Sequence, residues 1–440
     1  MAINLYPPQR ENVEKLKLAL SKHDCVGIWS ATGTGKTLVA LTVAKELNLK
    51  PLICCPLAAF ATWKSWAEEL EVPLIGVVNQ EKLKTGKTPW VTLRVEGKQK
   101  RFSWTLNPNA EMLIFDEIHR GLSGTASQAG AMAAMTRVQK IKTQLLSATP
   151  FTSPLNLRSV GFLFRMHNYS ASSFYDFCRR HGCRASRFHR GLEFDHASRL
   201  SRVHLQRIAE FLADRTVRLT TDDLAEFFGE SFVEPTLINL AERDRAEIDA
   251  AYAAMADEVK KKEHSNPIVT LLRARQRAEL LSIEAVADMV ENSVNEGLSV
   301  FVAQSFRESV VQMEAALRKR GISDLSILTG DSNSDHRIDA VDAFQMDRNR
   351  VFLATTAAGG LSVSLHRLRE GGRPRTSIIR VSYSVSELAQ ALGRIYRAGM
   401  LDKTVVQRLP LVAGTPEERI YVRLQHKLRN MKTMVDSDLI

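Results

Sequence analysis

Two short motifs contain the residue types best suited to chemistry. The first, Ser30–Thr37, reads Ser-Ala-Thr-Gly-Thr-Gly-Lys-Thr. Glycines let backbone N–H groups turn toward phosphate oxygens, Lys36 is predicted to reach the β- and γ-phosphates, and the Thr37 hydroxyl is predicted to hold Mg²⁺. The strict pattern has glycine where Ser30 stands, so it is met only in part. The residues expected to bind the nucleotide here are Thr32, Gly33, Thr34, Gly35, Lys36 and Thr37.

The second motif is the acidic pair in Asp116-Glu117-Ile118-His119, directly after the apolar run Met112–Phe115. A carboxylate at the carboxyl end of a strand points into the crevice where α/β sheets bind ligands. We expect Asp116 to bind Mg²⁺ through water and Glu117 to orient and polarise the attacking water. An adjacent acidic pair is by itself more often a solvated strand end, and its pairing with the phosphate loop favours the functional interpretation.

Short apolar runs alternate with helical stretches and predict the elements that position these motifs. Val26–Trp29 is predicted as a strand before the phosphate loop, and Leu38–Leu47 as a helix after it. Residues 154–230 are expected to be mainly helical. Ser231–Ala241, which contains Pro235, is expected to be an extended connector.

A second alternating series begins at Leu298. It predicts an α/β fold of two tandem units of parallel sheet covered by helices. The expected boundaries are a first unit over 1–230 with a helical elaboration over about 154–230, a connector and helix over 231–265, and a second unit over 266–440.

The motifs resemble those of superfamily 2 helicases and translocases, and within them the Swi/Snf-like branch. Gln9, after Tyr6-Pro7-Pro8, resembles the adenine-reading glutamine of that family, and Pro56, followed by Leu57 and Trp63, resembles a motif that faces nucleic acid. The resemblance implies two RecA-like lobes, a helical insertion after Ser-Ala-Thr-Pro and a nucleotide cleft between the lobes. It also implies that His119, Ser147, Ala148 and Thr149 couple hydrolysis to motion.

The second half carries the corresponding motifs of this family. Ser305, Gly330 and Thr355 lie in segments that resemble its nucleic-acid-contacting loops, and Gly360 lies in an Ala-Gly-Gly motif typical of the Swi/Snf branch. Residues 390–397 read Gln-Ala-Leu-Gly-Arg-Ile-Tyr-Arg. On a helix predicted over Glu387–Tyr396, the residues at i, i+4 and i+7 share one face. The resemblance implies that this face closes over ATP, with catalytic roles for Gln390, Arg394 and Arg397, the two arginines acting as fingers on the transferring phosphoryl group.

A basic segment follows the coupling motif. Its arginines alternate with Phe177 and Phe188, and such residues bind phosphates and stack on exposed bases. We expect nucleic-acid contacts here, with a solvated basic helix as the alternative. The residues predicted to make these contacts are Arg179, Arg180, Arg184 and Arg187. Lys98, Lys100 and Arg101 predict a basic hairpin, for which we favour a surface hairpin with aromatic residues packed beneath it over a second nucleic-acid contact.

Composition fits this interpretation. The 440 residues carry 60 Lys+Arg against 49 Asp+Glu, a net charge of +11, which favours a polyanionic partner. No apolar run approaches the roughly 18–20 residues that span a bilayer, so we expect a cytoplasmic location in a nucleoid or a host cell rather than a secreted or membrane protein. The five cysteines argue against a disulfide scaffold, and the spacing of Cys178 and Cys183 is too loose to indicate a zinc site.

The expected activity is ATP hydrolysis with Mg²⁺, driving movement along or remodelling of duplex, forked or branched DNA. The alternatives are an RNA helicase or RNA-stimulated ATPase, and a non-catalytic nucleic-acid-binding subunit. The short glycine-containing loop near Gly371 and the lack of room for a reader domain resemble small phage and viral members of the family. We expect either a monomer or a component of a replication, recombination or repair assembly.

Overall fold

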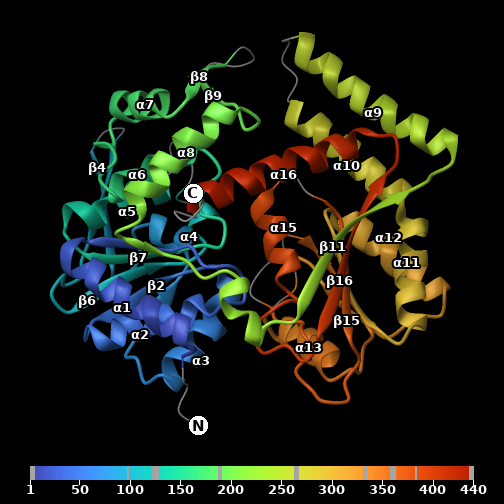
Figure 1. The fold of residues 1–440 in the computed structure, drawn as a ribbon, viewed down its shortest axis with the longest axis horizontal. Helices are drawn as coiled ribbons and strands as arrows, with labels where there is room; N and C mark the ends of the chain where they lie inside the picture. Colours follow the sequence, from blue (N-terminus) through green and yellow to red (C-terminus); the bar gives the residue numbers. More distant parts are fainter. Residues whose placement is uncertain are drawn as a thin grey trace. The chain divides into compact units, whose positions relative to one another are not determined.

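The computed structural model describes residues 5–96, 99–120, 122, 128–186, 191–261, 267–330, 332, 334–356, 363–381 and 384–435. The described chain divides into two units, one of Met1–Leu224 with His426–Ile440 and the other of Ala225–Gln425. Each contains a six-stranded sheet whose strands all pair in parallel. Figure 1 shows the strands of each unit with helices around them. The predicted α/β class with two parallel-sheet units is confirmed. Among the described residues, no helix is both long and apolar enough to cross a bilayer.

The sheet of the first unit has the order β10-β1-β7-β6-β2-β3. Its strands are β1 (Cys25–Ile28), β2 (Lys50–Cys54), β3 (Gly76–Val78), β6 (Glu111–Phe115), β7 (Lys142–Leu146) and β10 (Thr216–Val217). Buried apolar residues occupy both faces of these strands, as expected for a sheet covered on both sides. On β6, Met112 and Ile114 join one hydrophobic cluster while Leu113 and Phe115 join the other.

Helices cover both faces of this sheet. One cluster includes residues of α1 (Pro7–Lys22), α2 (Lys36–Glu46) and α3 (Phe60–Glu69). The opposite cluster takes in the antiparallel hairpin of β4 (Val91–Glu96) and β5 (Gln99–Trp104), which was predicted with its aromatic side chains packed beneath, as the buried Phe102 and Trp104 are. The other elements of this unit are α4 (Gln80–Lys84), α5 (Gln128–Val138), α6 (Arg158–Leu163), α7 (Ala171–Arg180), β8 (Cys183–Ala185), β9 (Leu192–Phe194) and α8 (Arg199–Leu212).

The sheet of the second unit has the order β11-β16-β15-β12-β14-β13. Its strands are β11 (Glu230–Ile238), β12 (Ser299–Gln304), β13 (Leu325–Leu328), β14 (Val351–Thr355), β15 (Arg375–Ile379) and β16 (Thr404–Val412). The segment expected as a connector is therefore the edge strand β11, paired along its length with β16. An edge strand tolerates Pro235 because one of its sides needs no ladder hydrogen bonds.

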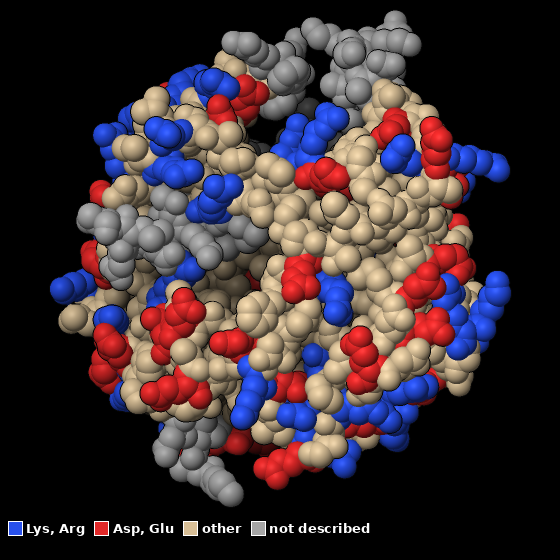
Figure 2. Space-filling view, turned by 45° about the vertical axis from the view of Figure 1, so that its right-hand side comes forward, with Lys and Arg blue, Asp and Glu red and all other residues tan. Residues whose placement is uncertain are grey.

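The helices of the second unit are α9 (Glu242–Lys261), α10 (Pro267–Leu281), α11 (Ile283–Asn295), α12 (Arg307–Lys319), α13 (Ser334–Gln345) and α15 (Val385–Leu392). The helix α16 (Pro416–Val435) begins in this unit, and its residues from His426 onward belong to the first unit. Apolar residues of α11 and α12 pack against Val300, Val302 and Leu353 on one face of the sheet. The other face carries the edge-to-face pairs of Phe352 with Phe301 and with Phe344. On the described part of the face drawn in Figure 2, Lys and Arg alternate with Asp and Glu, so the net positive charge forms no single patch there.

Candidate active site

The phosphate loop lies between β1 and α2, at the carboxyl edge of the first sheet. Its conformation depends on glycine, since Gly33 and Gly35 have φ values of +85° and +86°. The Lys36 ammonium donates to the carbonyl oxygens of Ser30 and Ala31, each at 3.0 Å, so it lies folded against the loop. Ser30 supports the loop from beneath, where its hydroxyl accepts a 2.9 Å hydrogen bond from the Leu219 amide.

Gln9, predicted to read adenine, is buried against this loop. Its Nε2 donates to the Thr34 carbonyl at 2.8 Å, and its Oε1 accepts from the Tyr6 amide at 2.9 Å. Its side-chain amide thus uses one donor and its acceptor within the chain and fixes the loop to the start of α1. A Cβ built on Gly35 would lie 2.4 Å from Nε2 of Gln9.

A methyl group at Gly35 should therefore distort the phosphate loop. We expect Gly35→Ala to be destabilised by roughly 1–2 kcal/mol through the left-handed backbone and to lose at least tenfold in ATP affinity through displacement of Gln9. Titration with a fluorescent ATP analogue, alongside thermal melting, measures both effects. Gly297→Ala is the matched control, because Gly297 has φ +82° and nothing within 4 Å of an added Cβ. If both variants bind ATP equally well, the clash with Gln9 has no role in nucleotide binding.

The acidic pair lies beside the phosphate loop on the same edge. β1, β7 and β6 are neighbours in the sheet, and their carboxyl ends lead into the phosphate loop, Ser147 and Asp116 respectively. Burial and the Glu117 carboxylate raise the pKa of Asp116, while the indole of Trp63 and the charge of Lys36 act in the opposite direction. Glu117 has a left-handed backbone with φ +52°, a conformation that is uncommon for residues other than glycine.

Trp63 is buried beside Asp116 rather than exposed to nucleic acid as expected. The resemblance put it with Pro56 and Leu57 in a motif facing nucleic acid. Its side chain is only 1% exposed, and its Nε1 donates a 3.0 Å hydrogen bond to Asp116. It therefore orients the carboxylate predicted to hold the metal. Leu57, by contrast, is 66% exposed on the turn after β2.

His119 connects the acidic pair to the coupling motif. Its Nδ1 lies 3.2 Å from a carboxylate oxygen of Glu117 and 3.1 Å from the Ser147 hydroxyl. The Ser147 oxygen also accepts a 3.1 Å hydrogen bond from the Thr149 amide. Ala148 lies between Ser147 and Thr149 in the sequence. The four predicted coupling residues therefore lie together, close to Glu117, the predicted base.

The second unit places its predicted nucleic-acid contacts on one edge. Ser305, Gly330 and Thr355 follow or end β12, β13 and β14, which are adjacent parallel strands. The Ser305 amide donates to Glu279 at 2.8 Å, and Gly330 has open space where a side chain would be. Gly360 and Arg187 lie outside the described residues.

The arginine motif differs from its prediction in one respect. α15 ends at Leu392 with Gly393 as its C-cap, so Arg394 and Arg397 are not on a helical face with the buried Gln390. The two guanidiniums meet in another way, because both donate to the carbonyl oxygen of Val363, at 2.9 and 3.1 Å. Burial lowers the pKa of Arg397 to about 10, which leaves it charged at neutral pH. No sequence pattern indicates that the Val363 carbonyl binds these two arginines, or that the Trp63 indole binds Asp116.

The basic segment after the coupling motif is partly neutralised within the first unit. Arg179 pairs with Asp176 at 3.1 Å, Arg180 is exposed, and Arg184 lies 3.4 and 3.6 Å from the carboxylates of Glu193 and Asp195. The expectation that Phe177 stacks on bases is wrong. Phe177 is 3% exposed and packs on His181 with a centroid distance of 4.6 Å.

Comparison with known proteins agrees with these motifs. Residues 6–157 match the DEAD/DEAH box helicase family. An Acanthamoeba polyphaga mimivirus protein named as an ATP-dependent RNA helicase is 28% identical over 99% of this chain and 84% of its own length. The SWI/SNF-related matrix-associated actin-dependent regulator of chromatin subfamily A-like protein 1 of Drosophila melanogaster is 25% identical over 97% of this chain. This chain spans only 55% of the fly protein.

Among solved structures, the SWI2/SNF2 ATPase core of Sulfolobus solfataricus in complex with dsDNA is 15% identical and covers 100% of this chain and 94% of its own, with a TM-score of 0.40. The nucleotide motifs and the matched helicase domain define an ATP-hydrolysing enzyme of the helicase class that uses nucleic acid. These matches confirm the resemblance of the chain to superfamily 2 helicases and to their Swi/Snf-like branch.

Proposed function

We propose that this ATPase acts on DNA, moving along or remodelling duplex or branched substrates with energy from ATP. The observation that carries the catalytic part of the proposal is the convergence of Lys36, Asp116, Glu117 and Ser147 at the carboxyl ends of three adjacent strands. Ligands of α/β sheets bind at this edge. The site therefore offers a cation for the phosphates, a metal-binding carboxylate, a base for water and a route to the coupling motif.

The residues present fit a divalent cation. Asp116 and Glu117 are adjacent, half-buried acids, and burial together with the Glu117 charge raises the pKa of Asp116. A bound cation relieves such repulsion and favours the ionised carboxylate. Thr37 and Asp116 would hold Mg²⁺, which when bound neutralises charge on the transferring phosphoryl group.

The roles of the remaining site residues follow from their chemistry. Glu117 accepts a proton from the attacking water, and Lys36 leaves the loop carbonyls to bind phosphate oxygens. Gln9 holds the loop beside the nucleotide base. In this proposal the second unit supplies Arg394 and Arg397 to the same nucleotide, and Gln390 supports them.

Coupling to movement is assigned to the His119–Ser147 contact. Ionisation or protonation of Glu117 changes the charge beside His119, which alters the hydrogen bond to Ser147 and hence the segment through Thr149. The strand-end residues Ser305, Gly330 and Thr355, with Pro56 and the arginines of α7 and β8, are proposed to contact the phosphate backbone. Such contacts position a protein on nucleic acid without reading its sequence.

The names of the two relatives point to different nucleic acids. The fly relative is named as a regulator of chromatin, which supports DNA, whereas the mimivirus relative is named as an RNA helicase, which supports RNA as the second candidate. None of the predicted contacts specifically reads a 2′-hydroxyl.

The panel that separates the candidates measures ATP hydrolysis with duplex DNA, single-stranded DNA, forked DNA, duplex RNA and single-stranded RNA. We expect duplex or forked DNA to raise kcat at least tenfold more than either RNA at about 0.1 M salt, because phosphate contacts are salt-dependent and must be compared at one ionic strength. Greater stimulation by RNA would transfer the assignment to the second candidate. Lys36→Ala, tested in parallel, identifies hydrolysis by contaminating enzymes.

A further inference from the structure

The segment that carries Arg394 and Arg397 is bound along its length to the segment before β15. The Leu365 amide donates to the Arg394 carbonyl at 2.9 Å, and the Leu401 amide donates to the Arg367 carbonyl at 3.2 Å. With the shared Val363 carbonyl, these bonds join two stretches that are separate in sequence. The backbone on both sides of Arg397 is therefore held by residues 363–367.

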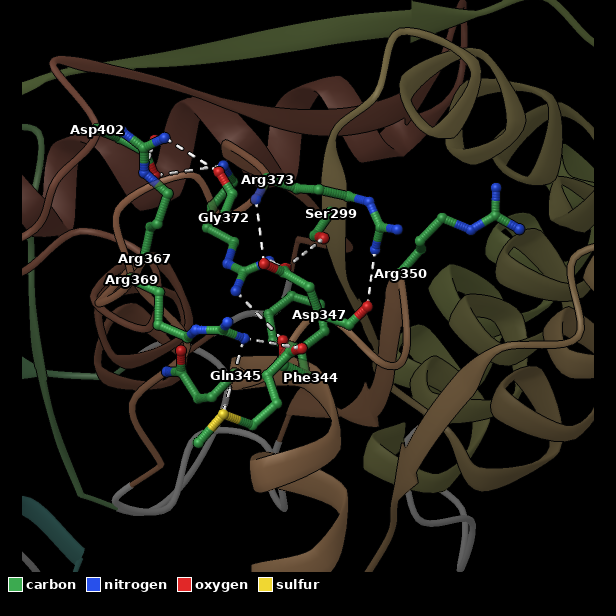
Figure 3. Close-up of polar contacts among 12 residues, drawn as sticks. Ser299, Phe344, Gln345, Asp347, Arg350, Arg367, Arg369, Gly372, Arg373 and Asp402 are labelled. Atoms are coloured by element: carbon green, nitrogen blue, oxygen red, sulfur yellow. Dashed lines mark hydrogen bonds and ion pairs between the residues drawn. The ribbon is translucent and has the colours of Figure 1, made fainter.

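Arg367 is the centre of this junction. Its Nη2 donates to the Leu401 carbonyl at 2.8 Å, its Nη1 donates to the Gly372 carbonyl at 3.1 Å, and its Nε lies 3.0 Å from the Asp402 carboxylate. Figure 3 shows the guanidinium of Arg367 directed at Asp402 and Gly372. One planar side chain thus contacts two backbone carbonyls and one carboxylate, an arrangement that lysine with a single ammonium cannot reproduce.

Asp402 anchors the junction in the core of the second unit. Its side chain is 3% exposed, and it accepts a 3.3 Å hydrogen bond from the Arg375 amide at the start of β15. The Arg375 guanidinium is itself buried, 2.7 Å from Asp347 and over the ring of Phe344. A buried carboxylate that loses its partner is strongly destabilising, so the pair of Arg367 and Asp402 holds this geometry firmly.

The need for such an anchor comes from the end of α15. Because the helix ends at Leu392, no helical hydrogen bonds fix the backbone at Arg397, and tertiary contacts must do so. A catalytic group misplaced by about 1 Å can cost on the order of a hundredfold in rate.

We propose that Arg367 and Asp402 are positioning residues for Arg397, holding its backbone so that the guanidinium can reach the transferring phosphoryl group. The inference rests on the proposed role of Arg397 as an arginine finger. Arg367 and Asp402 touch neither substrate nor reacting atoms, and they act only through the segment between Arg394 and Asp402.

The test compares Arg367→Ala and Asp402→Asn with wild type in ATP hydrolysis at saturating duplex DNA. We expect kcat to fall about tenfold or more for Arg367→Ala and severalfold for Asp402→Asn, with KM for ATP changed less than about twofold. Asp402→Asn keeps the shape of the side chain and an acceptor, so it tests the inference if the alanine variant does not fold.

Arg350→Ala is the matched control. Arg350 pairs with Asp324 at 2.5 and 2.8 Å in the same unit and makes none of the described contacts to residues 394–402. Because this pair is more exposed than that of Arg367 and Asp402, we expect Arg350→Ala to lower the melting temperature less and to keep wild-type kcat. Equal loss of kcat in Arg350→Ala would show a general effect of stability and overturn the inference.

A double variant distinguishes positioning from an independent effect. If Arg367 acts through Arg397, Arg367→Ala should reduce kcat no further in an Arg397→Ala background. Additive losses would overturn the inference. Wild-type turnover in the single variant Arg397→Ala would overturn the arginine-finger assignment. If Arg397→Ala is inactive but folded Arg367→Ala and Asp402→Asn keep wild-type kcat, only the positioning role is overturned.

Discussion

Replacing Glu117 with glutamine is expected to leave ATP bound and almost unhydrolysed. Glutamine has the size of glutamate but cannot accept a proton from water, and loss of such a base typically costs 10²–10⁴-fold in rate. Lys36, Thr37 and Gln9 are unchanged, so nucleotide affinity should stay within a few-fold of wild type. Single-turnover hydrolysis and filter-binding of radiolabelled ATP measure the two quantities separately.

The control for this variant is Glu111→Gln. Glu111 lies at the start of the same strand, β6, where its carboxylate accepts a hydrogen bond from the Asn107 amide at 2.8 Å. We expect its turnover to match wild type. Hydrolysis by Glu117→Gln within fivefold of wild type would show that another group activates water.

Replacing Arg397 with alanine is expected to remove nucleic-acid-stimulated turnover while leaving ATP binding to the first unit nearly intact. An arginine finger contributes roughly 10³–10⁵ in kcat by stabilising charge in the transition state. The pKa of about 10 keeps Arg397 charged at neutral pH, so the wild-type residue can play this part. The loss should appear in kcat and much less in ATP affinity, because the interaction forms mainly in the transition state.

Arg397 also binds the Gly393 and Val363 carbonyls, so a second substitution is needed to exclude local unfolding. Arg397→Lys retains a charge without the planar fork and should recover only a small part of the rate. Arg318→Ala, an exposed α12 residue paired with Glu314, is the control and should hydrolyse normally. Normal stimulated turnover in Arg397→Ala would assign the catalytic charge elsewhere.

Local sequence patterns predicted where the motifs of the proposed site lie, because each of them follows a strand. The apolar runs before Ser30 and Asp116 are short and bounded by polar residues, so the loop and the acidic pair could be placed at strand ends. Because the strands of a parallel sheet have their carboxyl ends at the same edge, the phosphate loop and the acidic pair were expected to lie side by side. Nothing in the sequence states that β7 lies between β1 and β6. The family resemblance therefore grouped His119 and Ser147 as coupling residues without predicting that their side chains touch.

The errors have physical causes that spacing does not encode. Gly393 ended α15 early, although the i, i+4, i+7 spacing of Gln390, Arg394 and Arg397 fits a continuous helix. Pro235 suggested a connector, but it is accommodated in the edge strand β11. Trp63 was assigned to nucleic acid by the family resemblance and Phe177 by its aromatic type, whereas burial in the core determines what both side chains contact.

The central claim is that this site hydrolyses ATP in response to DNA. Steady-state phosphate release with and without duplex DNA, for wild type and Lys36→Ala, tests it most directly. We predict at least tenfold stimulation of the wild type by DNA and no hydrolysis above background in Lys36→Ala, because the lysine charge on the β- and γ-phosphates is lost. Equal rates with and without DNA, or wild-type hydrolysis by Lys36→Ala, would contradict it.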